Sequence, residues 1–314
     1  MLSPQQGHID VALTNVSLMF NNKSFISEKV APPVPVLKES AKYLVYGTDH
    51  LRAGIDLRRP ATRSNQLELS TTFAGPYFCD GHALHDYVSD EGAVNADKPI
   101  DLEVDVTNTL TEAIFLNREV NLVSALIAAL NPTDLSASTY ANAWDQSGID
   151  PIAVIDAAKE TVQLQIARRP NTMVLSRPVF RAIRNNPNVK ARVSGALEGI
   201  DKSLITPQQL AQLLEVDQVL IGEAVKNTAA PNQTPSDAFV WGRSAFLCYV
   251  PESPGLRTPA LAYQFTWDAG NLGSLVYTKY DDERHAKRIE VMKYYDVRVV
   301  SALCGVGWIN ASST

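Results

Sequence analysis

The chain has 314 residues, 45% of them hydrophobic and 20% charged, which is the balance of an ordinary globular protein. Its net charge of −6 argues against a protein that grips nucleic-acid phosphates over its whole surface, and leaves room only for a local basic patch. Three widely spaced cysteines fit a reducing compartment without a disulfide framework. Neither a signal peptide nor an apolar run of roughly 18 residues occurs, so we expect no membrane span.

Residues 1–42 are predicted to form an N-terminal arm rather than a compact unit. Pro32, Pro33 and Pro35 favour an extended, polyproline-like path, and proline cannot donate to the interior of a sheet. Such an arm needs a surface to lie on, either its own body or a neighbour. The apolar residues that would make this contact are Phe25, Ile26, Val34 and Val36.

Residues 43–78 are predicted to form a long two-stranded ribbon. Tyr43–Tyr46 starts the outward run, and the alternation of polar and apolar residues over 66–70 marks the return run. A ribbon of this kind has little core of its own, so we expect it to lie across another surface. Its tip carries four arginines that could meet phosphate or carboxylate on another subunit: Arg52, Arg58, Arg59 and Arg63.

The pattern Cys79-x-x-His82-x-x-His85 is the one local candidate for a metal site, because thiolate and imidazole are zinc ligands. A tetrahedral site needs a fourth ligand, however, and no second Cys/His pair lies at a recognisable spacing. Gly81 also weakens a helix that would place both histidines on one side. We therefore favour packing or surface roles for these residues and expect no cofactor. Without any nucleotide-binding, nucleophile-elbow or metalloprotease motif, the sequence offers no catalytic residues.

A long helix is predicted over about 110–130, after a strand at 101–106. Thr109 and Glu112 have the spacing of a capping box, and Asn131-Pro132 would end the helix. A helical spacing of 4, 3, 4 and 3 relates the apolar residues of one expected buried row, namely Leu116, Val120, Val123, Ile127 and Leu130. A second apolar row makes the expected buried stripe wide, and it consists of Phe115, Leu122, Leu126 and Ala129.

The following segment predicts a small α/β layer. Asp150-Pro151 is a helix start, Thr172–Ser176 a short buried strand, and 177–184 a second helix. Thr206 and Gln209 form another capping box before a helix that reaches Leu214. Further strands are expected at 217–225, 239–250, 263–267, 275–280 and 290–300, and the apolar C-terminal stretch 299–309 should close a sheet with the long helix.

This order of elements resembles the major capsid protein of tailed double-stranded DNA bacteriophages, which has the Hong Kong 97-type fold. The segments at 25–36, 49–70 and 109–130 resemble the N-terminal arm, extended loop and spine helix of that family. TPQQLAQLLEVDQVLIGEAVKNTA (206–229) and VWGRSAFLCYVPE (240–252) resemble its axial domain, and 283–309 resembles the strands that return to the peripheral domain.

The resemblance implies an α+β fold in four parts. These are an N-terminal arm at 1–42, an extended β-ribbon loop at 43–78, a peripheral domain at 79–149 and 275–314 with the spine helix, and an α/β axial domain at 150–274. The arginines of the ribbon tip and the four apolar arm residues would then lie at inter-subunit contacts. We predict no lysine–asparagine cross-link, and the early start of the arm implies that any scaffold is a separate protein.

The resemblance also implies a structural protein without enzymatic activity. It would assemble with itself into hexamers and pentamers of an icosahedral head, first as a procapsid and then as an expanded shell around packaged DNA. The implied partners are portal and scaffolding proteins, a decoration protein in some relatives, and DNA in non-specific contact. Assembly would take place in the host cytoplasm, and the mature protein would be part of the virion.

Two other functions compete with this one. An encapsulin-like shell would share the fold but load protein cargo through a peptide groove instead of packaging DNA. A zinc-dependent hydrolase would use Cys79, His82 and His85, and predicts bound metal and a large loss of function in His82→Ala.

Overall fold

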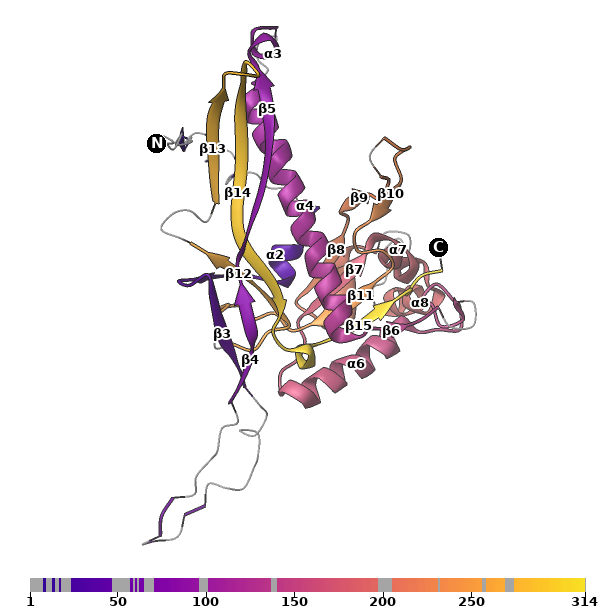
Figure 1. Ribbon diagram of the computed structural model, residues 1–314. Helices are drawn as coiled ribbons and strands as arrows, with labels where there is room; N and C mark the ends of the chain where they lie inside the picture. The colour runs from indigo at the N-terminus through magenta and orange to yellow at the C-terminus, as the bar shows by residue number, and fades with distance from the viewer. Residues whose placement is uncertain are drawn as a thin grey trace.

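The computed structural model describes residues 8–9, 13–14, 17, 24–46, 57–58, 60, 62–64, 71–95, 101–136, 140–196, 205–230, 232–255, 258–268 and 274–313. Within these ranges, two β-sheets flank one long helix, and a two-stranded ribbon extends from the end of one sheet (Figure 1). We call the sheet beside the N-terminal half of the helix the peripheral sheet and the other the axial sheet.

The long helix α4 spans Leu102–Leu130, so it begins about two turns earlier than predicted. Asp101 caps it, because its side chain accepts hydrogen bonds from the backbone N–H groups of Glu103 and Val104. The predicted strand at 101–106 and the predicted cap at Thr109 are therefore wrong. Thr109 lies inside the helix, where its hydroxyl donates to the Asp105 carbonyl at 2.9 Å. Asn131, in the left-handed conformation before Pro132, ends α4 as predicted.

The buried face of α4 agrees with the predicted one in part, since Leu122 and Leu126 of the second predicted row are fully buried. Val123 is buried as predicted, whereas Ile127 is 38% exposed. Polar and charged residues occupy part of the buried line, so hydrophobicity alone does not mark it. The buried residues are Thr107, Thr111, Ile114, Arg118, Glu119, Leu122, Val123 and Leu126.

By length and composition, α4 could also cross a membrane, a test that core helices of soluble proteins equally pass. Two observations identify it as a core helix. Arg118 and Glu119 lie in its middle and bind polar groups of the protein itself. Its first half packs on the peripheral sheet through Ile114, and its second half packs on the axial sheet through Leu122 and Leu126.

The peripheral sheet is built around β14 (Ala286–Val299). Among the described residues its strand order is β1 (His8–Ile9), β13 (Ser274–Asp281), β14, β12 (Ala262–Trp267) and β2 (Pro33–Val36), and β5 (Asp80–Ser89) also pairs with β14. α4 lies along β14 and β5 (Figure 1). The short helix α3 (Asp90–Asn95) follows β5 at the far end of this sheet.

The axial sheet has, among the described residues, the order β6 (Thr133–Asp134), β15 (Gly305–Ile309), β11 (Ala245–Cys248), β7 (Thr172–Ser176) and β8 (Gln218–Gly222). Four helices pack their apolar side chains with this sheet: α6 (Pro151–Ile166), α7 (Arg177–Asn185), α8 (Pro187–Ala196) and α9 (Pro207–Leu213). The predicted caps at Asp150 and Thr206 and the buried strand β7 are confirmed. Helix α8 was not predicted.

Three strands lie in a different sheet from the one that the predicted domain boundaries assign to them. β12 falls in the range 150–274 but belongs to the peripheral sheet, whereas β6 falls in 79–149 and β15 in 275–314 but both belong to the axial sheet. Close packing helps to place β15: a Cβ added at Gly307 would lie 2.8 Å from the Phe246 ring. Strand propensity predicts that a strand exists, but the pairing partner depends on contacts distant in sequence.

The remaining elements project from the two sheets. β9 (Val225–Asn227) and β10 (Asp237–Phe239) form a hairpin beside the axial sheet, and Gly242 occupies the tight turn before β11 with a φ of 53°. β3 (Ser40–Tyr46) and β4 (Thr71–Phe78) form the antiparallel ribbon. The predicted return run at 66–70 lies outside the described residues.

Candidate assembly surfaces

The N-terminal segment 24–36 is fastened to the protein's own body. Its helix α2 (Ser27–Val30) has no side-chain cap of its own. Instead, the fully buried Glu119 carboxylate of α4 accepts hydrogen bonds from the backbone N–H groups of Ile26 at 3.2 Å and Ser27 at 2.8 Å. The same carboxylate accepts a 2.6 Å hydrogen bond from the Trp241 indole. One side chain thus joins the N-terminal segment, the long helix and the axial unit, a name we give to the axial sheet with α6–α9, the β9–β10 hairpin and the turn before β11.

A second group of charges surrounds this junction. Arg118 forms an ion pair with Glu28 at 2.9 Å, and its guanidinium lies 4.4 Å from the centroid of the Phe115 ring. The Lys293 ammonium of β14 lies 4.1 Å from the same ring. Burial, together with the nearby Arg118 charge, lowers the pKa of Lys293 to about 8. The two cations are tolerated because the ring face and the Glu28 carboxylate supply negative charge.

The apolar residues of the predicted arm are mostly buried within the chain. Val34 and Val36 point into the core beneath β12, and Ile26 packs against α4 and the axial unit. Phe25 is half-buried beside Phe115. Because Pro33 and Pro35 alternate with the buried valines on the edge strand β2, their missing N–H groups cost no hydrogen bond of the sheet interior. Of the two surfaces that the prolines left open for the arm, the described segment uses its own body.

The ribbon, in contrast, is held only at its base. Tyr77 stacks on Phe265 of β12 with ring centroids 4.6 Å apart, and Tyr43 packs on the same ring at 5.5 Å. The Phe78 backbone N–H donates to the Asp296 carboxylate at 2.9 Å. Beyond this base, β3 and β4 pair only with each other among the described residues, and they extend away from both sheets (Figure 1).

The arginines predicted at the ribbon tip lie partly outside the described residues. Arg58 and Arg63 are described and exposed, and the Arg58 Nε donates to the Thr62 carbonyl at 2.8 Å. Arg52 and Arg59 lie outside the described residues. Leu57, which precedes Arg58 in the chain and has 80% of its surface accessible, adds an exposed apolar group to this charged tip.

The structure separates the side chains of the candidate zinc site that the sequence analysis did not favour. His82 and His85 lie on strand β5, where an odd spacing points side chains to opposite faces of the sheet. His82 stacks on Tyr295 at 4.1 Å, His85 packs edge-on against Tyr87, and Cys79 is fully buried. Burial also raises the pKa of Cys79 to about 11, which disfavours the thiolate that zinc requires. No cluster of three metal-ligating residues occurs within the described ranges.

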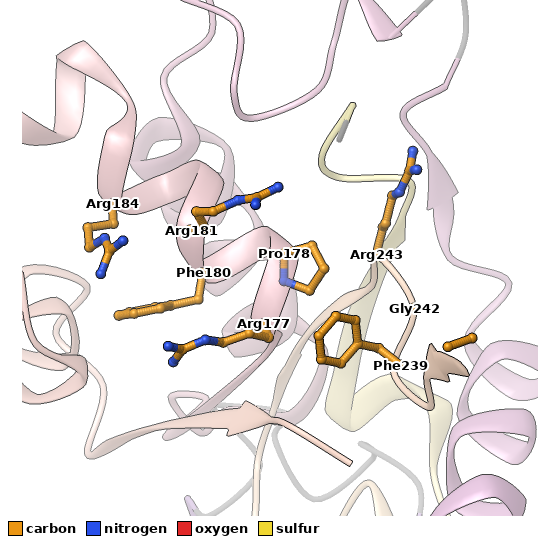
Figure 2. A pocket seen from close by; sticks show the side chains of 9 residues that line it. Arg177, Pro178, Phe180, Arg181, Arg184, Phe239, Gly242 and Arg243 are labelled. Carbon is orange, nitrogen blue, oxygen red and sulfur yellow. The ribbon is translucent and has the colours of Figure 1, made fainter. Parts of the chain in front are cut away.

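A basic surface that the sequence analysis did not predict lies in the axial unit. Arg177, Arg181 and Arg184 project from α7, and Arg243 projects from the facing turn before β11 (Figure 2). Together with Phe180 and Phe239 they line a hollow of about 500 Å³, which we call the arginine hollow. The spacing of the three arginines on one short helix was a visible signal, but Arg243 joins them only through the fold.

Comparison with known proteins places the chain in a family. No family model matches it. The major capsid protein of Burkholderia phage BcepMu is 30% identical over 262 residues, which cover 80% of this chain and 80% of that protein. The major capsid protein of Pseudomonas phage JBD67 is 29% identical over 250 residues, 77% of each chain. The chain belongs to the bacteriophage major capsid proteins. It is a structural component of the virion capsid.

Solved structures agree on the fold. A phage-related protein from Bordetella bronchiseptica RB50 superposes with a TM-score of 0.76 over 98% of this chain and 99% of its own, at 24% identity. The capsid of cyanophage P-SCSP1u gives a TM-score of 0.57 at 9% identity and covers 98% of this chain and 90% of its own. The SrpI encapsulin of Synechococcus elongatus PCC 7942 gives 0.56 at 12%, with 98% of each chain covered. The α+β capsid fold, predicted as Hong Kong 97-type, is thus confirmed. The phage relatives favour the virion over a cargo shell.

Proposed function

We propose that this capsid protein builds its shell by laying the β3–β4 ribbon over a neighbouring copy, in hexamers and pentamers of an icosahedral head. The observation that carries the proposal is a contrast in support: the ribbon packs through Tyr43 and Tyr77 at its base, and among the described residues its two strands pair only with each other. An isolated two-stranded ribbon is marginal in water, so a second surface would stabilise it. The exposed Arg58 and Arg63 would add charge contacts there.

The finer roles belong to the same proposal. We infer that the protein has no enzymatic activity, because the only candidate site, Cys79 with His82 and His85, is divided between a buried thiol and two faces of a strand. We further propose portal and scaffolding proteins as partners, a decoration protein as an optional one, and non-specific contact with packaged DNA. Shell assembly before packaging fits a chain whose net charge of −6 repels DNA at long range.

The test is electron microscopy with sedimentation of the purified full chain. Wild type is compared with a variant in which residues 47–70 are replaced by a short glycine–serine turn that keeps the β3–β4 base. We expect closed shells or rings from wild type and only small species from the variant. The unfolding temperature of the rest of the chain should be the same in both proteins. Shells from the shortened variant would contradict the ribbon's role. Nucleic acid rather than protein cargo inside particles made in cells would separate a phage head from an encapsulin.

A further inference from the structure

The axial unit is electrostatically divided along its sequence. Residues 177–196, which form α7 and α8, contain five basic residues and no acidic one. Residues 205–255 contain five acidic and two basic residues. A chain with a net charge of −6 therefore gathers positive charge on one part of its axial unit. Such a concentration creates a local positive potential that would attract an opposite charge in the working assembly.

Within the arginine hollow, the protein's own acidic groups neutralise only part of this positive charge. Arg177 forms an ion pair with Glu223 at 2.9 Å. Arg243 donates to the Ser313 carbonyl at 3.0 Å and to the Tyr140 hydroxyl at 3.4 Å, both neutral acceptors. The lining itself contains no carboxylate. Among the described residues, no acidic side chain lies within ion-pair distance of Arg184 or Arg243.

The shape and floor of the hollow indicate what kind of anion would enter. The floor is apolar, with Pro178, Phe180 and the 38% exposed Phe239 between the guanidiniums (Figure 2). A carboxylate at the end of a side chain brings its own methylene groups to such a floor. A DNA duplex presents phosphates along a convex surface and has no apolar group to fill it. The hollow therefore suits a protein carboxylate better than a nucleic-acid backbone.

A second charged hollow, lined by three carboxylates and two arginines, lies at the other end of the same sheet. β7 runs from Asn171 to the arginine hollow, a span of about 17 Å for five strand residues. At its start, Asp217 and Glu252 line a second hollow of about 490 Å³, and both are exposed. Arg169 there pairs with Glu215, and Arg168 donates to the neutral Tyr249 hydroxyl, so this lining keeps an excess of one negative charge. In the described chain, Asp217 and Glu252 have no cation within ion-pair distance.

We propose that the arginine hollow of one copy receives the Asp217 and Glu252 carboxylates of the next copy. Two different surfaces meeting head to tail generate a ring when the rotation between copies closes, which is the contact that a ring of identical subunits requires. The inference rests on the proposed shell assembly and adds to it a contact between axial units. Bidentate guanidinium–carboxylate pairs over an apolar floor would fix the register of neighbours.

A charge-swap experiment on the full chain tests the contact by sedimentation and negative-stain microscopy. Arg181→Glu with Arg184→Glu should lower the assembled fraction at least ten-fold, while Arg181→Lys with Arg184→Lys assembles like wild type. Asp217→Lys with Glu252→Lys should show the same loss. The four reversals combined should restore assembly to within two-fold of wild type, because the attraction returns with the signs exchanged. Thermal unfolding of each variant verifies that the monomer folds.

Three results would overturn the contact. Normal shells from both reversed pairs would do so and leave the proposed shell function standing. Loss in both pairs without recovery in the combined variant would show that the two surfaces do not meet each other. Shells of the arginine variant that form normally but lose bound nucleic acid would reassign the hollow to phosphate.

Discussion

The N-terminal segment and the ribbon adjoin in sequence and begin from similar sequence cues, yet they reach opposite states. Both were expected to need a surface to lie on, which for the N-terminal arm was either its own body or a neighbour. The segment 24–36 buries Ile26, Val34 and Val36 in its own chain. The described part of the ribbon is fixed at its base, where Tyr43 and Tyr77 meet Phe265 and the Phe78 N–H binds Asp296. Extended, proline-rich or ribbon-like sequence therefore does not by itself identify an assembly element. A buried polar anchor does separate the two cases.

The anchor is Glu119, and its removal should have the largest effect on the attachment that distinguishes the N-terminal segment from the ribbon. In Glu119→Ala, three donors from Ile26, Ser27 and Trp241 lose their acceptor in a buried site. We expect the free energy of unfolding to fall by about 3–5 kcal/mol. Chemical denaturation of the unassembled chain measures it. Increased hydrogen exchange in residues 26–31 would show that the N-terminal segment is released first.

Glu103 provides the matched control on the same helix. It forms an ion pair with Lys287 at 2.6 Å, but its side chain is 35% exposed. Removing such a partly exposed pair costs about 0–1 kcal/mol. Equal losses in Glu103→Ala and Glu119→Ala would show that the junction around Glu119 has no special role.

A smaller effect is expected from truncating one buried valine of β2. Val34 is 4% exposed and packs with Phe265 in the parallel pairing of β2 and β12, while Leu37, at 98% exposed, follows the same strand. Val34→Ala should lower the free energy of unfolding by about 2 kcal/mol, since two methyl groups leave a packed site. Leu37→Ala should change it by less than about 0.5 kcal/mol. A larger loss at Leu37 would contradict the assignment of segment 24–36 to the chain's own core.

The features that sequence reasoning predicted well are local ones. The Asp150 and Thr206 caps lie within three residues of the N–H groups that they bind, so their spacing is visible in the sequence. The start of α4 was missed because Leu102, Val104 and Val106 alternate like a strand, although Asp101 was available as a cap. Long-range features, such as β15 in the axial sheet, could not be predicted from propensity.

The candidate surfaces divide in the same way. The ribbon was predictable because a run of arginines between two extended stretches is a local pattern, and its base forms where expected. The Glu119 junction had one visible signal, a charged pair in the middle of an apolar helix. Its partners Ile26 and Trp241 are distant in sequence, so only the fold identifies the charge as an anchor.

A pH titration tests the junction that holds the N-terminal segment, because Lys293 lies beside Phe115 and Arg118 there. Its pKa of about 8 in the folded chain is below the ordinary lysine value of 10.5, so the unfolded chain binds more protons between these values. This group therefore opposes folding below about pH 8, and its penalty is relieved as the pH rises toward 10.5. Lys293→Met should be more stable than wild type at pH 7, and the difference between the two should shrink by pH 10.

Buried tyrosines set the limit of that experiment. Burial raises the pKa of Tyr295 to about 12, so stability from this group is lost as the pH rises above the ordinary tyrosine value. Both proteins share that loss, and the comparison of wild type with Lys293→Met cancels it. A difference that stays constant from pH 7 to 10 would show that Lys293 is not desolvated in solution.

Substitutions in the ribbon are expected to have the smallest effect on monomer stability. The same substitutions should still reduce the yield of assembled shells. Arg58 and Arg63 are exposed, so Arg58→Glu with Arg63→Glu should change the free energy of unfolding by less than about 0.5 kcal/mol. If the ribbon lies on a neighbour, the same reversal should reduce shell yield in sedimentation, and Arg58→Lys with Arg63→Lys should retain it. Unchanged yield would mean that these two side chains face solvent in the shell. The ribbon would then contribute through its backbone and apolar residues such as Leu57, as the N-terminal segment does within the chain.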